Sequence, residues 1–361
     1  MRRYELGMSL DYCSDWGVPE AVREFFQNAL DEQTANPENK MYFEYKDNKL
    51  YIGNRLSKLN AESLLLGVSS KRGNDNLIGT HGEGYKVATV VLARNGVTVT
   101  VYNNEREVWT SKVVKSRRYN ADICVFDVEK KIFKQDNNLL FVLDGITEEM
   151  YQGVVDSNLH LQEDIGETKE SDCGRLLMDE KYKGKIFVSG LYVCTRSQFD
   201  FGYDFAPNMI KLDRDRGLID SFDLNFATSK LLAGTRDSEF LASISGKHDC
   251  QFMSTYVRDT DLGSNVGRIV YDRYVEDYGD DFVPVSNMNT FNEIHRRGGN
   301  PVLCNSSEYE LMKPFAKDFV EENMDLQARY ELWKSDASVY LPNRLVKEID
   351  EIWELSMKTK E

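Results

Sequence analysis

The segment that follows Trp16 carries apolar residues at the three-and-four spacing of one helix face, namely Val22, Phe25, Phe26 and Ala29. Pro19 precedes this stripe at a position that suits the first turn of a helix. The pattern predicts a helix over residues 16–31 whose apolar stripe faces a core.

Residues 41–52 change to a period of two, which is the period of a half-buried strand. Asp47-Asn48 interrupts the alternation, so this segment is predicted to form a hairpin with its turn at that dipeptide. Further alternating runs predict strands at residues 97–102, 108–114, 122–128 and 138–143.

Two helical segments lie between the hairpin and the later strands. We expect a short helix over residues 61–67 and a longer one over residues 85–94, closed by Asn95-Gly96. Helices on one face of a mixed, mostly antiparallel sheet make an α+β domain. We assign this domain to residues 1–165.

A polar stretch over residues 162–172 is predicted to be a linker or a mobile loop. Beyond it, residues 175–260 are expected to form a second α/β domain. A hairpin centred on Ser189-Gly190 and a helical stretch over residues 220–232 support this assignment. The 361 residues of the chain are enough for two or three domains with separate cores.

The last hundred residues, 262–361, change to short mixed elements, from which we predict a small C-terminal α/β region. An amphipathic helix is expected over residues 345–357. Nothing in this region indicates its role.

The net charge of −15 argues against free duplex nucleic acid as the main partner, because phosphate binding needs a cationic surface. No apolar run approaches the roughly 20 residues that a membrane-spanning helix needs. The N-terminal residues are charged with no apolar stretch behind them, and the six cysteines are scattered. We therefore expect a cytoplasmic protein with no membrane partner.

Glu24, Asn28 and Asp31 lie at positions i, i+4 and i+7 of the first predicted helix, so their side chains share one face. A carboxylate and an amide on one face can hold a water and a metal ion together. Magnesium accepts few protein oxygens when phosphate oxygens complete its shell. A solvated helix face is the ordinary alternative, and it is weakened because the apolar stripe already supplies the core face.

A glycine-rich loop precedes the helix at residues 85–94 and contains Gly79, Gly82 and Gly84. Glycines let the backbone approach a phosphate closely, and the N–H groups at a helix start favour an anion. Lys86, in the first turn, would add a positive charge. The loop has neither P-loop spacing nor a preceding βαβ pattern, so a P-loop and a Rossmann fold are set aside.

In this order and at this separation, the two motifs resemble the nucleotide site of the GHKL superfamily of ATPases, whose nucleotide-binding domain is a Bergerat-type α/β sandwich. The resemblance covers about residues 4–101, and the layout is most similar to GHKL-like ATP-binding proteins of phages and bacteria. It implies that Glu24 is the general base and that Asn28 binds magnesium. It also implies a set of further nucleotide-binding residues: Asp31, Gly79, Gly82, Gly84 and Lys86.

Two more segments resemble GHKL features less closely. Ser69 and Lys71 match the Ser-x-Lys stretch that precedes the nucleotide lid, although an ordinary polar loop fits them equally well. In a transducer-like second domain, which such a resemblance implies, Arg214, Arg216 or Lys230 would reach the terminal phosphate. Alternating charges of this kind are more often a surface ion-pair cluster.

The sequence departs from the superfamily after the second predicted strand. The usual Asp-x-Gly-x-Gly motif, whose aspartate binds the adenine amino group, is replaced by a segment that begins Gly53-Asn54-Arg55. The Asn54 side chain has both a donor and an acceptor, so it could accept a hydrogen bond from the amino group of adenine or donate one to another base. From the sequence we therefore expect ATP and GTP to bind within about tenfold, or roughly 1.4 kcal/mol, of each other.

These observations lead to two functional hypotheses. The first is magnesium-dependent binding of a nucleotide, ATP by resemblance, with slow hydrolysis that drives a conformational switch, and homodimerisation is consistent with it. The second is a GHKL-fold binding module that has lost catalysis and binds or inhibits a protein partner, as a phage effector would. The intact Glu24 favours the first, and the missing aspartate motivates the second.

Overall fold

The computed structural model describes residues 1–60, 84–207, 209–210, 212, 221–317 and 326–358. The chain separates into two compact units, Met1–Ala227 and Thr228–Glu361. The boundary falls inside helix α4 (Ser221–Gly234). The expected domain limits at residues 165, 175, 260 and 262 stay a prediction.

The first unit contains a seven-stranded sheet with the order β1-β6-β5-β4-β7-β3-β2. Every neighbouring pair in this sheet is antiparallel. Its strands are β1 (Arg2–Ser9), β2 (Met41–Lys46), β3 (Lys49–Asn54), β4 (Thr98–Asn103), β5 (Glu107–Ser116), β6 (Ala121–Lys130) and β7 (Leu139–Asp144).

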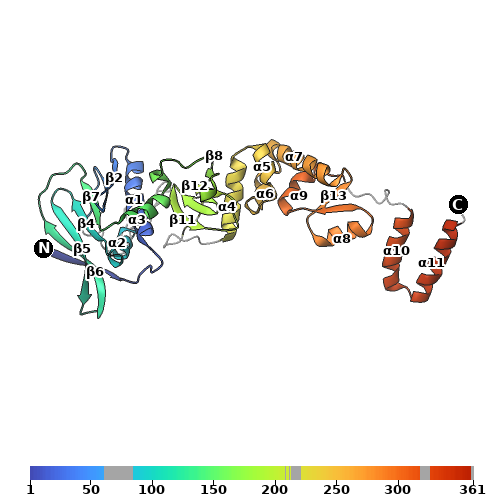
Figure 1. The fold of residues 1–361 in the computed structure, drawn as a ribbon, viewed down its shortest axis with the longest axis horizontal. Helices are drawn as coiled ribbons and strands as arrows, with labels where there is room; N and C mark the ends of the chain where they lie inside the picture. Colours follow the sequence, from blue (N-terminus) through green and yellow to red (C-terminus); the bar gives the residue numbers. More distant parts are fainter. Residues whose placement is uncertain (61–83, 208, 211, 213–220, 318–325, 359–361) are drawn as a thin grey trace. The chain divides into compact units, whose positions relative to one another are not determined.

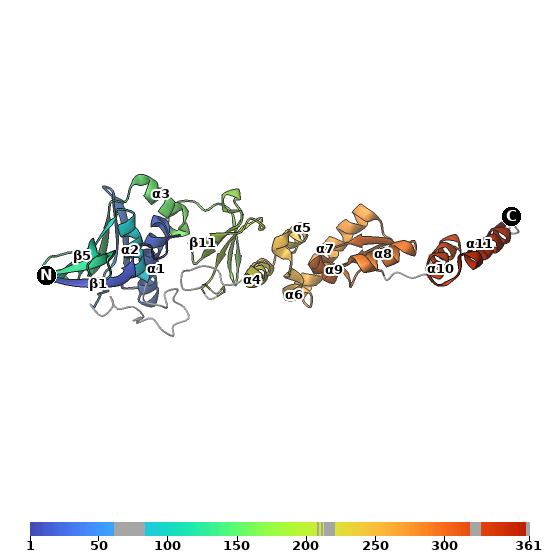
Figure 2. The same cartoon turned by 90° about the horizontal axis from the view of Figure 1, so that it is seen from below.

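One face of this sheet is covered by α1 (Val18–Ala35) and α2 (Gly84–Arg94), with α3 (Glu148–Asp156) packed on α1 (Figure 1, Figure 2). The core between the layers is formed by the apolar stripe of α1 and by alternate side chains of the central strands. The α+β class with helices beside a large antiparallel sheet is therefore confirmed. The finer Bergerat layout stays a prediction.

The predicted elements of this unit match the structure closely. The β2–β3 hairpin pairs Lys46 with Lys49, so its turn is Asp47-Asn48, and both turn residues have positive φ. The predicted helices at residues 16–31 and 85–94 correspond to α1 and α2, and all four later strands are present. The helix expected over residues 61–67 lies outside the described residues.

A second sheet of five strands follows, with the order β11-β10-β12-β9-β8. Its strands are β8 (Thr168–Ser171), β9 (Gly174–Leu177), β10 (Lys185–Val188), β11 (Leu191–Thr195) and β12 (Gly202–Phe205). Strands β10 and β12 pair in parallel, and the other pairs are antiparallel. The turn at Ser189-Gly190 between β10 and β11 is confirmed.

The prediction of a linker over residues 162–172 is wrong in part. Residues 168–171 form strand β8 at the edge of the second sheet, paired with β9. A short edge strand exposes most of its side chains, so it needs no apolar alternation and its sequence resembles a loop. Two 3₁₀ turns, Leu159–Leu161 and Glu180–Tyr182, flank this region.

The second unit is mainly helical. Strands β13 (Phe282–Val285) and β14 (Asn300–Leu303) pair in parallel and are joined by α8 (Met288–Arg296). The other helices are α5 (Ser238–Ile244), α6 (Met253–Val257), α7 (Asp261–Tyr278), α9 (Ser306–Met312), α10 (Leu326–Tyr340) and α11 (Asn343–Lys358), with a 3₁₀ turn at His248–Cys250. Helix α11 confirms the terminal amphipathic helix.

The prediction of short mixed elements after residue 262 is wrong in part, because α7 has 18 residues. Gly263 and Gly267 lie inside this helix and weaken its apolar pattern in the sequence. A methyl group at Gly263 would lie 2.0 Å from the Val257 carbonyl oxygen, and one at Gly267 would lie 2.2 Å from the Leu311 carbonyl oxygen. These glycines allow close packing rather than end the helix.

A buried carboxylate connects α5, α7 and α9 in this unit. Glu308 accepts hydrogen bonds from Ser245 Oγ at 2.6 Å, Arg273 Nη2 at 3.1 Å and Tyr274 Oη at 3.0 Å. Burial, and then the charge of Glu308, raise the pKa of Tyr274. The carboxylate is satisfied by these donors and by Asn305, so we interpret it as structural.

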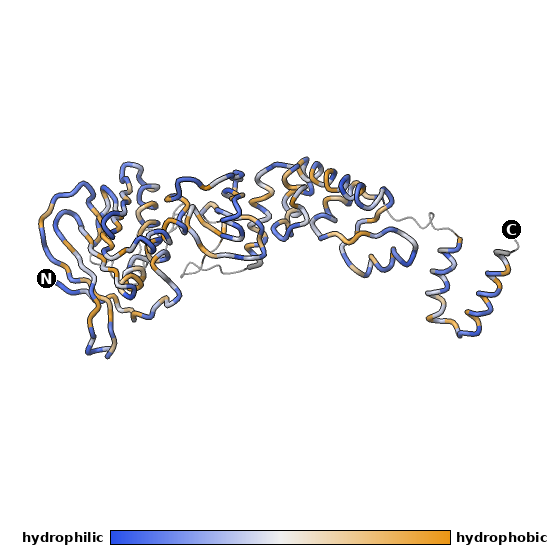
Figure 3. The backbone as a smooth tube through the Cα atoms, viewed as in Figure 1, coloured by the Kyte–Doolittle hydropathy of each residue, from blue (hydrophilic) through white to orange (hydrophobic). Residues whose placement is uncertain are grey.

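Among the residues that the structure describes, no helix is long and apolar enough to cross a membrane. Hydrophobic and hydrophilic positions follow one another along the strands and helices (Figure 3), and many of the hydrophobic ones are buried.

Candidate functional site

Helix α1 is unusual because it buries polar residues as well as its apolar stripe. Glu24 and Gln27 are each 2% exposed, and Asp31 is also buried. The helix begins after Gly17, whose backbone N–H donates to Glu20 Oε2 at 2.9 Å, which is the Glu half of a capping box. The solvated-face alternative for Glu24 and Asp31 is therefore contradicted by the burial of both carboxylates.

The two sequence motifs meet where Glu24 faces the start of α2. A methyl group added to Gly84 would lie 2.0 Å from Glu24 Oε2 and 3.1 Å from Glu24 Cδ. Gly84 is the first residue of α2, so the carboxylate occupies the space that any larger residue at position 84 would fill. The candidate general base and the end of the glycine-rich segment thus form one site.

The relative position of α1 and α2 is fixed at the far end of α2. Arg94 donates hydrogen bonds to the backbone oxygens of four residues that precede α1: Leu10, Tyr12, Cys13 and Trp16. A guanidinium can satisfy several carbonyls at once because its donors form a rigid fork. Arg94 therefore holds the segment that precedes α1 against the C-terminal end of α2. The sequence did not indicate this role.

Asn28 is half-buried on α1, one turn beyond Glu24. Its Nδ2 donates to the Glu24 carbonyl oxygen at 2.7 Å. Since this bond orients the amide nitrogen toward the helix backbone, Oδ1 is the end of the side chain directed elsewhere. Oδ1 is also the only atom of this side chain that can bind a cation, so the orientation fits a magnesium ligand.

Lys86 lies in the first turn of α2 and is fully buried, with its Nζ 5.9 Å from the centroid of the Tyr85 ring. A buried ammonium group needs compensating charge or hydrogen bonds. Its burial close to Gly84 places a cation in the same region as the Glu24 carboxylate. Its contact with phosphate stays a prediction.

Asn54 is the last residue of strand β3, and its side chain is buried against α1. Its Nδ2 donates to the Ala29 carbonyl oxygen at 2.9 Å and to the Asn39 carbonyl oxygen at 3.2 Å. Both partners are acceptors, so the amide nitrogen must face them and Oδ1 is the remaining polar atom. The sequence left both amide orientations open, and these two carbonyls select one of them.

The segment after Asn54 is held by side-chain amides instead of the glycines of the usual motif. Asn39 Oδ1 accepts from the backbone N–H of Leu56 at 2.7 Å. Asn103 both accepts from and donates to the backbone of Leu59. Asn138 donates to the Ser57 carbonyl oxygen. These amides fix residues 55–59 beside the end of α1.

Several predicted site residues lie outside the described residues. Ser69, Lys71, Gly79 and Gly82 fall in residues 61–83, and Arg214 and Arg216 fall in residues 213–220. Their roles stay predictions.

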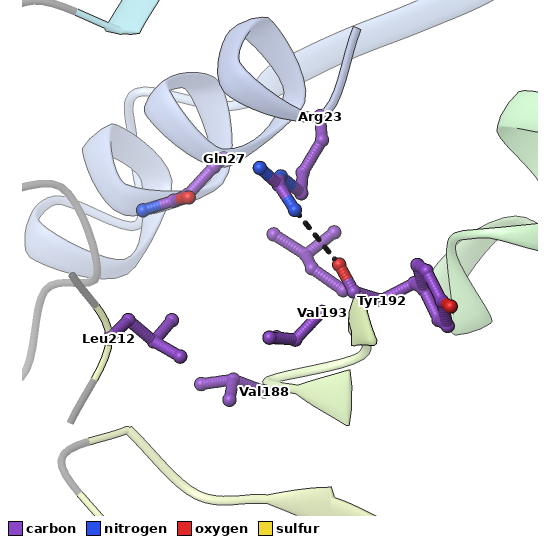
Figure 4. A pocket seen from close by; sticks show the side chains of 7 residues that line it. Arg23, Gln27, Val188, Tyr192, Val193 and Leu212 are labelled. Carbon is purple, nitrogen blue, oxygen red and sulfur yellow. Dashed lines mark hydrogen bonds between the residues drawn. The ribbon is translucent and has the colours of Figure 1, made fainter. Parts of the chain in front are cut away.

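Arg23, which the sequence did not single out, connects α1 to the second sheet within the first unit. Its Nε lies 3.8 Å from Glu24 Oε1, and its guanidinium lies 5.3 Å from the centroid of the Trp16 ring. Its Nη1 donates to the carbonyl oxygen of Tyr192 in β11 at 3.0 Å (Figure 4). One arginine thus contacts the candidate base and the second sheet.

A small pocket adjoins this contact, as Figure 4 shows. Arg23 and Gln27 of α1 line one side, and the other lining residues are Val188, Leu191, Tyr192, Val193 and Leu212. The Gln27 Nε2 is buried and has no hydrogen-bond partner among the described residues. Sequence patterns could not reveal this pocket, because its two sides are about 165 residues apart in the chain.

Comparisons with known proteins add little to this geometry. No family model matches the chain. An uncharacterised protein of Mycoplasma pneumoniae is 23% identical over 219 residues, which covers 59% of this chain and 88% of that protein. The crystal structure of the B subunit of DNA gyrase from Myxococcus xanthus is similar with a TM-score of 0.30 and 11% identity, covering 66% of this chain and 94% of that one. Neither likeness is strong enough to assign a family.

Proposed function

We propose that the chain binds a nucleoside triphosphate with magnesium and hydrolyses it slowly, and that ATP is the preferred substrate. The observation that carries this proposal is the contact between Glu24 and Gly84. It unites a buried carboxylate with the start of a helix that follows a glycine-rich segment. A carboxylate beside a phosphate-binding helix terminus is the arrangement that a water-activating base requires.

In this proposal Glu24 accepts a proton from the water that attacks the γ-phosphate in line. Arg23 keeps the carboxylate in place through its charge, 3.8 Å away. Asn28 Oδ1 would hold magnesium, which when bound would supply positive charge that offsets the charge of the phosphates. Lys86 would add a further positive charge at the start of α2.

The same geometry supports a conformational role. Arg23 contacts Glu24 and also donates to the Tyr192 carbonyl oxygen in β11. A movement of Glu24 on nucleotide binding would therefore displace Arg23 and, through its hydrogen bond, β11. A state change of the second sheet is then coupled to occupancy of the site. Turnover is expected to be slow, since the output is a change of state.

A thermal-shift screen tests the proposal broadly. The full chain is mixed with ATP, GTP, CTP or UTP, each with and without magnesium. A ligand at a hundred times its dissociation constant adds about 2.7 kcal/mol to the unfolding free energy, so a bound nucleotide raises the midpoint clearly. If no nucleotide raises it, the catalytically inactive binding module becomes the better hypothesis, as the replacement of the usual aspartate by Asn54 suggests.

Replacing Asn28 with alanine should weaken magnesium-dependent binding far more than metal-free binding. The amide oxygen would be an inner ligand of the ion, and its loss would not affect the backbone contacts to phosphate. We expect at least about a tenfold loss with magnesium, or roughly 1.4 kcal/mol, and less than about threefold without it. Calorimetric titration of both proteins measures this difference, and equal losses under the two conditions would remove Asn28 from the metal site.

The hydrogen bonds of Asn54 change the expected base preference. Since Nδ2 is used by the carbonyls of Ala29 and Asn39, only Oδ1 is left, and it can accept from the amino group of adenine. Guanine presents an oxygen at that position, and two acceptors repel each other. We now expect ATP to bind at least about tenfold more tightly than GTP, a difference of roughly 1.4 kcal/mol.

Competition titrations of ATP and GTP against one labelled nucleotide measure this ratio. Asn54→Ala should reduce it toward one, and the thermal midpoint of that variant reports the separate loss of the two backbone hydrogen bonds. Equal affinities in the unaltered protein would show that Asn54 does not read the base.

A further inference from the structure

Three loops of the first unit leave the seven-stranded sheet at one end. Leu139 of β7 pairs with both Asn54 of β3 and Asn103 of β4. Glu107 of β5 pairs in turn with Asn103 and with Lys130 of β6. The loops after β3, β4 and β6 and the strand residues beside them form a surface here named the sheet end, residues 55–58, 104–107 and 129–138.

Backbone hydrogen bonds join the three loops. The Lys131 N–H donates to the Arg106 carbonyl oxygen at 2.9 Å, which connects the loop after β6 to the loop after β4. The Asn138 N–H donates to the Arg55 carbonyl oxygen at 3.1 Å, which connects it to the loop after β3. The sheet end is therefore one continuous, ordered surface.

The sheet end is cationic although the chain as a whole is acidic. Its arginine and lysine side chains are all exposed, and they are Arg55, Lys58, Arg106, Lys130, Lys131 and Lys134. Its carboxylates are fewer, namely Glu105, Glu107, Glu129 and Asp136. None of the six cations forms an ion pair with another residue that the structure describes. The whole chain, by contrast, has 45 cations and 60 carboxylates, so this end carries positive charge against the trend of the chain.

Two large aliphatic side chains project from the same loops. Ile132 is 89% exposed and Leu56 is 51% exposed. The residue after Ile132 is held against the sheet, because the Phe133 N–H donates to the Glu105 carbonyl oxygen and its ring packs edge-on against Tyr102 with centroids 5.4 Å apart. Ile132 is thus presented to solvent by a fixed loop, between lysines on either side.

Aliphatic side chains among lysines fit the surface of an anionic membrane. The negative surface potential of such lipids attracts lysine and arginine. An aliphatic side chain gains free energy by entering the boundary between headgroups and acyl chains. Single strands of nucleic acid are bound instead by aromatic side chains on which the bases stack, whereas Ile132 and Leu56 are both aliphatic.

We propose that the sheet end attaches the protein to the surface of membranes that contain anionic phospholipid. Ile132 and Leu56 enter the boundary between headgroups and acyl chains, and the six cations lie at the headgroups. The expectation of no membrane partner rested on the lack of a long apolar run, which attachment at the surface does not require. This inference is independent of nucleotide binding.

The acidic remainder of the chain does not prevent this contact. At about 0.15 M salt the Debye length is about 8 Å, so carboxylates farther than that from the lipid surface are largely screened. The cations of the sheet end are screened less because they lie at the headgroups. Attachment should therefore weaken as the salt concentration rises.

Cosedimentation of the full chain with vesicles tests the proposal. The vesicles contain phosphatidylcholine alone or with about 30% phosphatidylserine, and the unaltered protein should bind the second kind at least about tenfold more strongly. Ile132→Ser should weaken that binding at least about fivefold, because the side chain no longer gains from contact with lipid. Val113→Ser is the matched control, since Val113 is 45% exposed and lies toward the β5–β6 turn at the other end of the sheet.

Removal of charge gives a second matched pair. Changing Lys130 and Lys131 together to glutamine should weaken binding to the anionic vesicles at least about tenfold. The same change at Arg117 and Arg118, which are exposed in the β5–β6 turn, should leave binding within about twofold. All four side chains are exposed, so the thermal midpoints of both variants should stay close to that of the unaltered protein.

Ile132→Trp distinguishes insertion from simple attraction of charges. On anionic vesicles its emission should shift to the blue relative to the unaltered chain, and bromine on the acyl chains should quench it. Binding without quenching would overturn the proposal, as would equal losses in the two charge variants. No binding at about 1 mM accessible lipid would overturn it too. Retention of a nucleic acid through Lys130 and Lys131, without vesicle binding, would assign the sheet end to that partner instead.

Discussion

Glu24→Gln should reduce the turnover of bound ATP by at least about a hundredfold, and up to about ten-thousandfold, because a glutamine amide cannot accept the proton of the attacking water. The substitution keeps the size of a side chain that is 2% exposed and packed against Gly84, so the shape of the site is retained. Nucleotide affinity should change little, since a base that acts on water makes no ground-state contact with the nucleotide. Phosphate release and calorimetric titration measure the two quantities.

Glu20→Gln is the matched control on the same helix. Glu20 accepts the capping hydrogen bond of Gly17, and a glutamine carbonyl oxygen can still accept it. This control should keep both turnover and stability. Turnover of Glu24→Gln equal to that of the control would remove Glu24 from the mechanism.

Gly84→Ala should cause the second largest loss of turnover, because it displaces the Glu24 carboxylate without removing it. The added methyl group would lie 2.0 Å from Glu24 Oε2, so the carboxylate must move away. A displacement of about 1 Å of a catalytic group can cost about a hundredfold in rate, and we expect a loss of that order. Stability should change little, because alanine favours a helix over glycine by about 1 kcal/mol and the carboxylate lies at the end of a flexible side chain.

Gly246→Ala is the control for this substitution, since a methyl group there meets only Glu308 Oε1 at 3.7 Å. Thermal midpoints of the two variants should be similar, and only Gly84→Ala should lose turnover. Full activity of Gly84→Ala would show that the contact between Gly84 and Glu24 has no functional consequence.

The sequence predicted the elements of the first sheet well because each has a clear local signal. The three-and-four stripe of α1, the period of two in β2 and β3 and the turn at Asp47-Asn48 all appear in the structure. Predictions failed where the local pattern was ambiguous. Strand β8 is a polar edge strand, and α7 contains glycines that serve packing against other segments.

The candidate site was predictable only as far as its residues lie on one element. Glu24 and Asn28 follow from helical spacing, but the contact of Glu24 with Gly84 depends on how α1 and α2 pack. The orientation of the Asn54 amide is set by two carbonyls from other parts of the chain. Arg23 gained its role from Tyr192, 169 residues away, which no local pattern indicates.

Calorimetric titration of the unaltered chain with ATP and magnesium tests the central claim most directly. The account predicts saturable binding of one nucleotide per chain, with an affinity that falls when magnesium is removed. Absence of saturable binding up to about 1 mM ATP, the level at which the binding free energy is only about −4 kcal/mol, would contradict it.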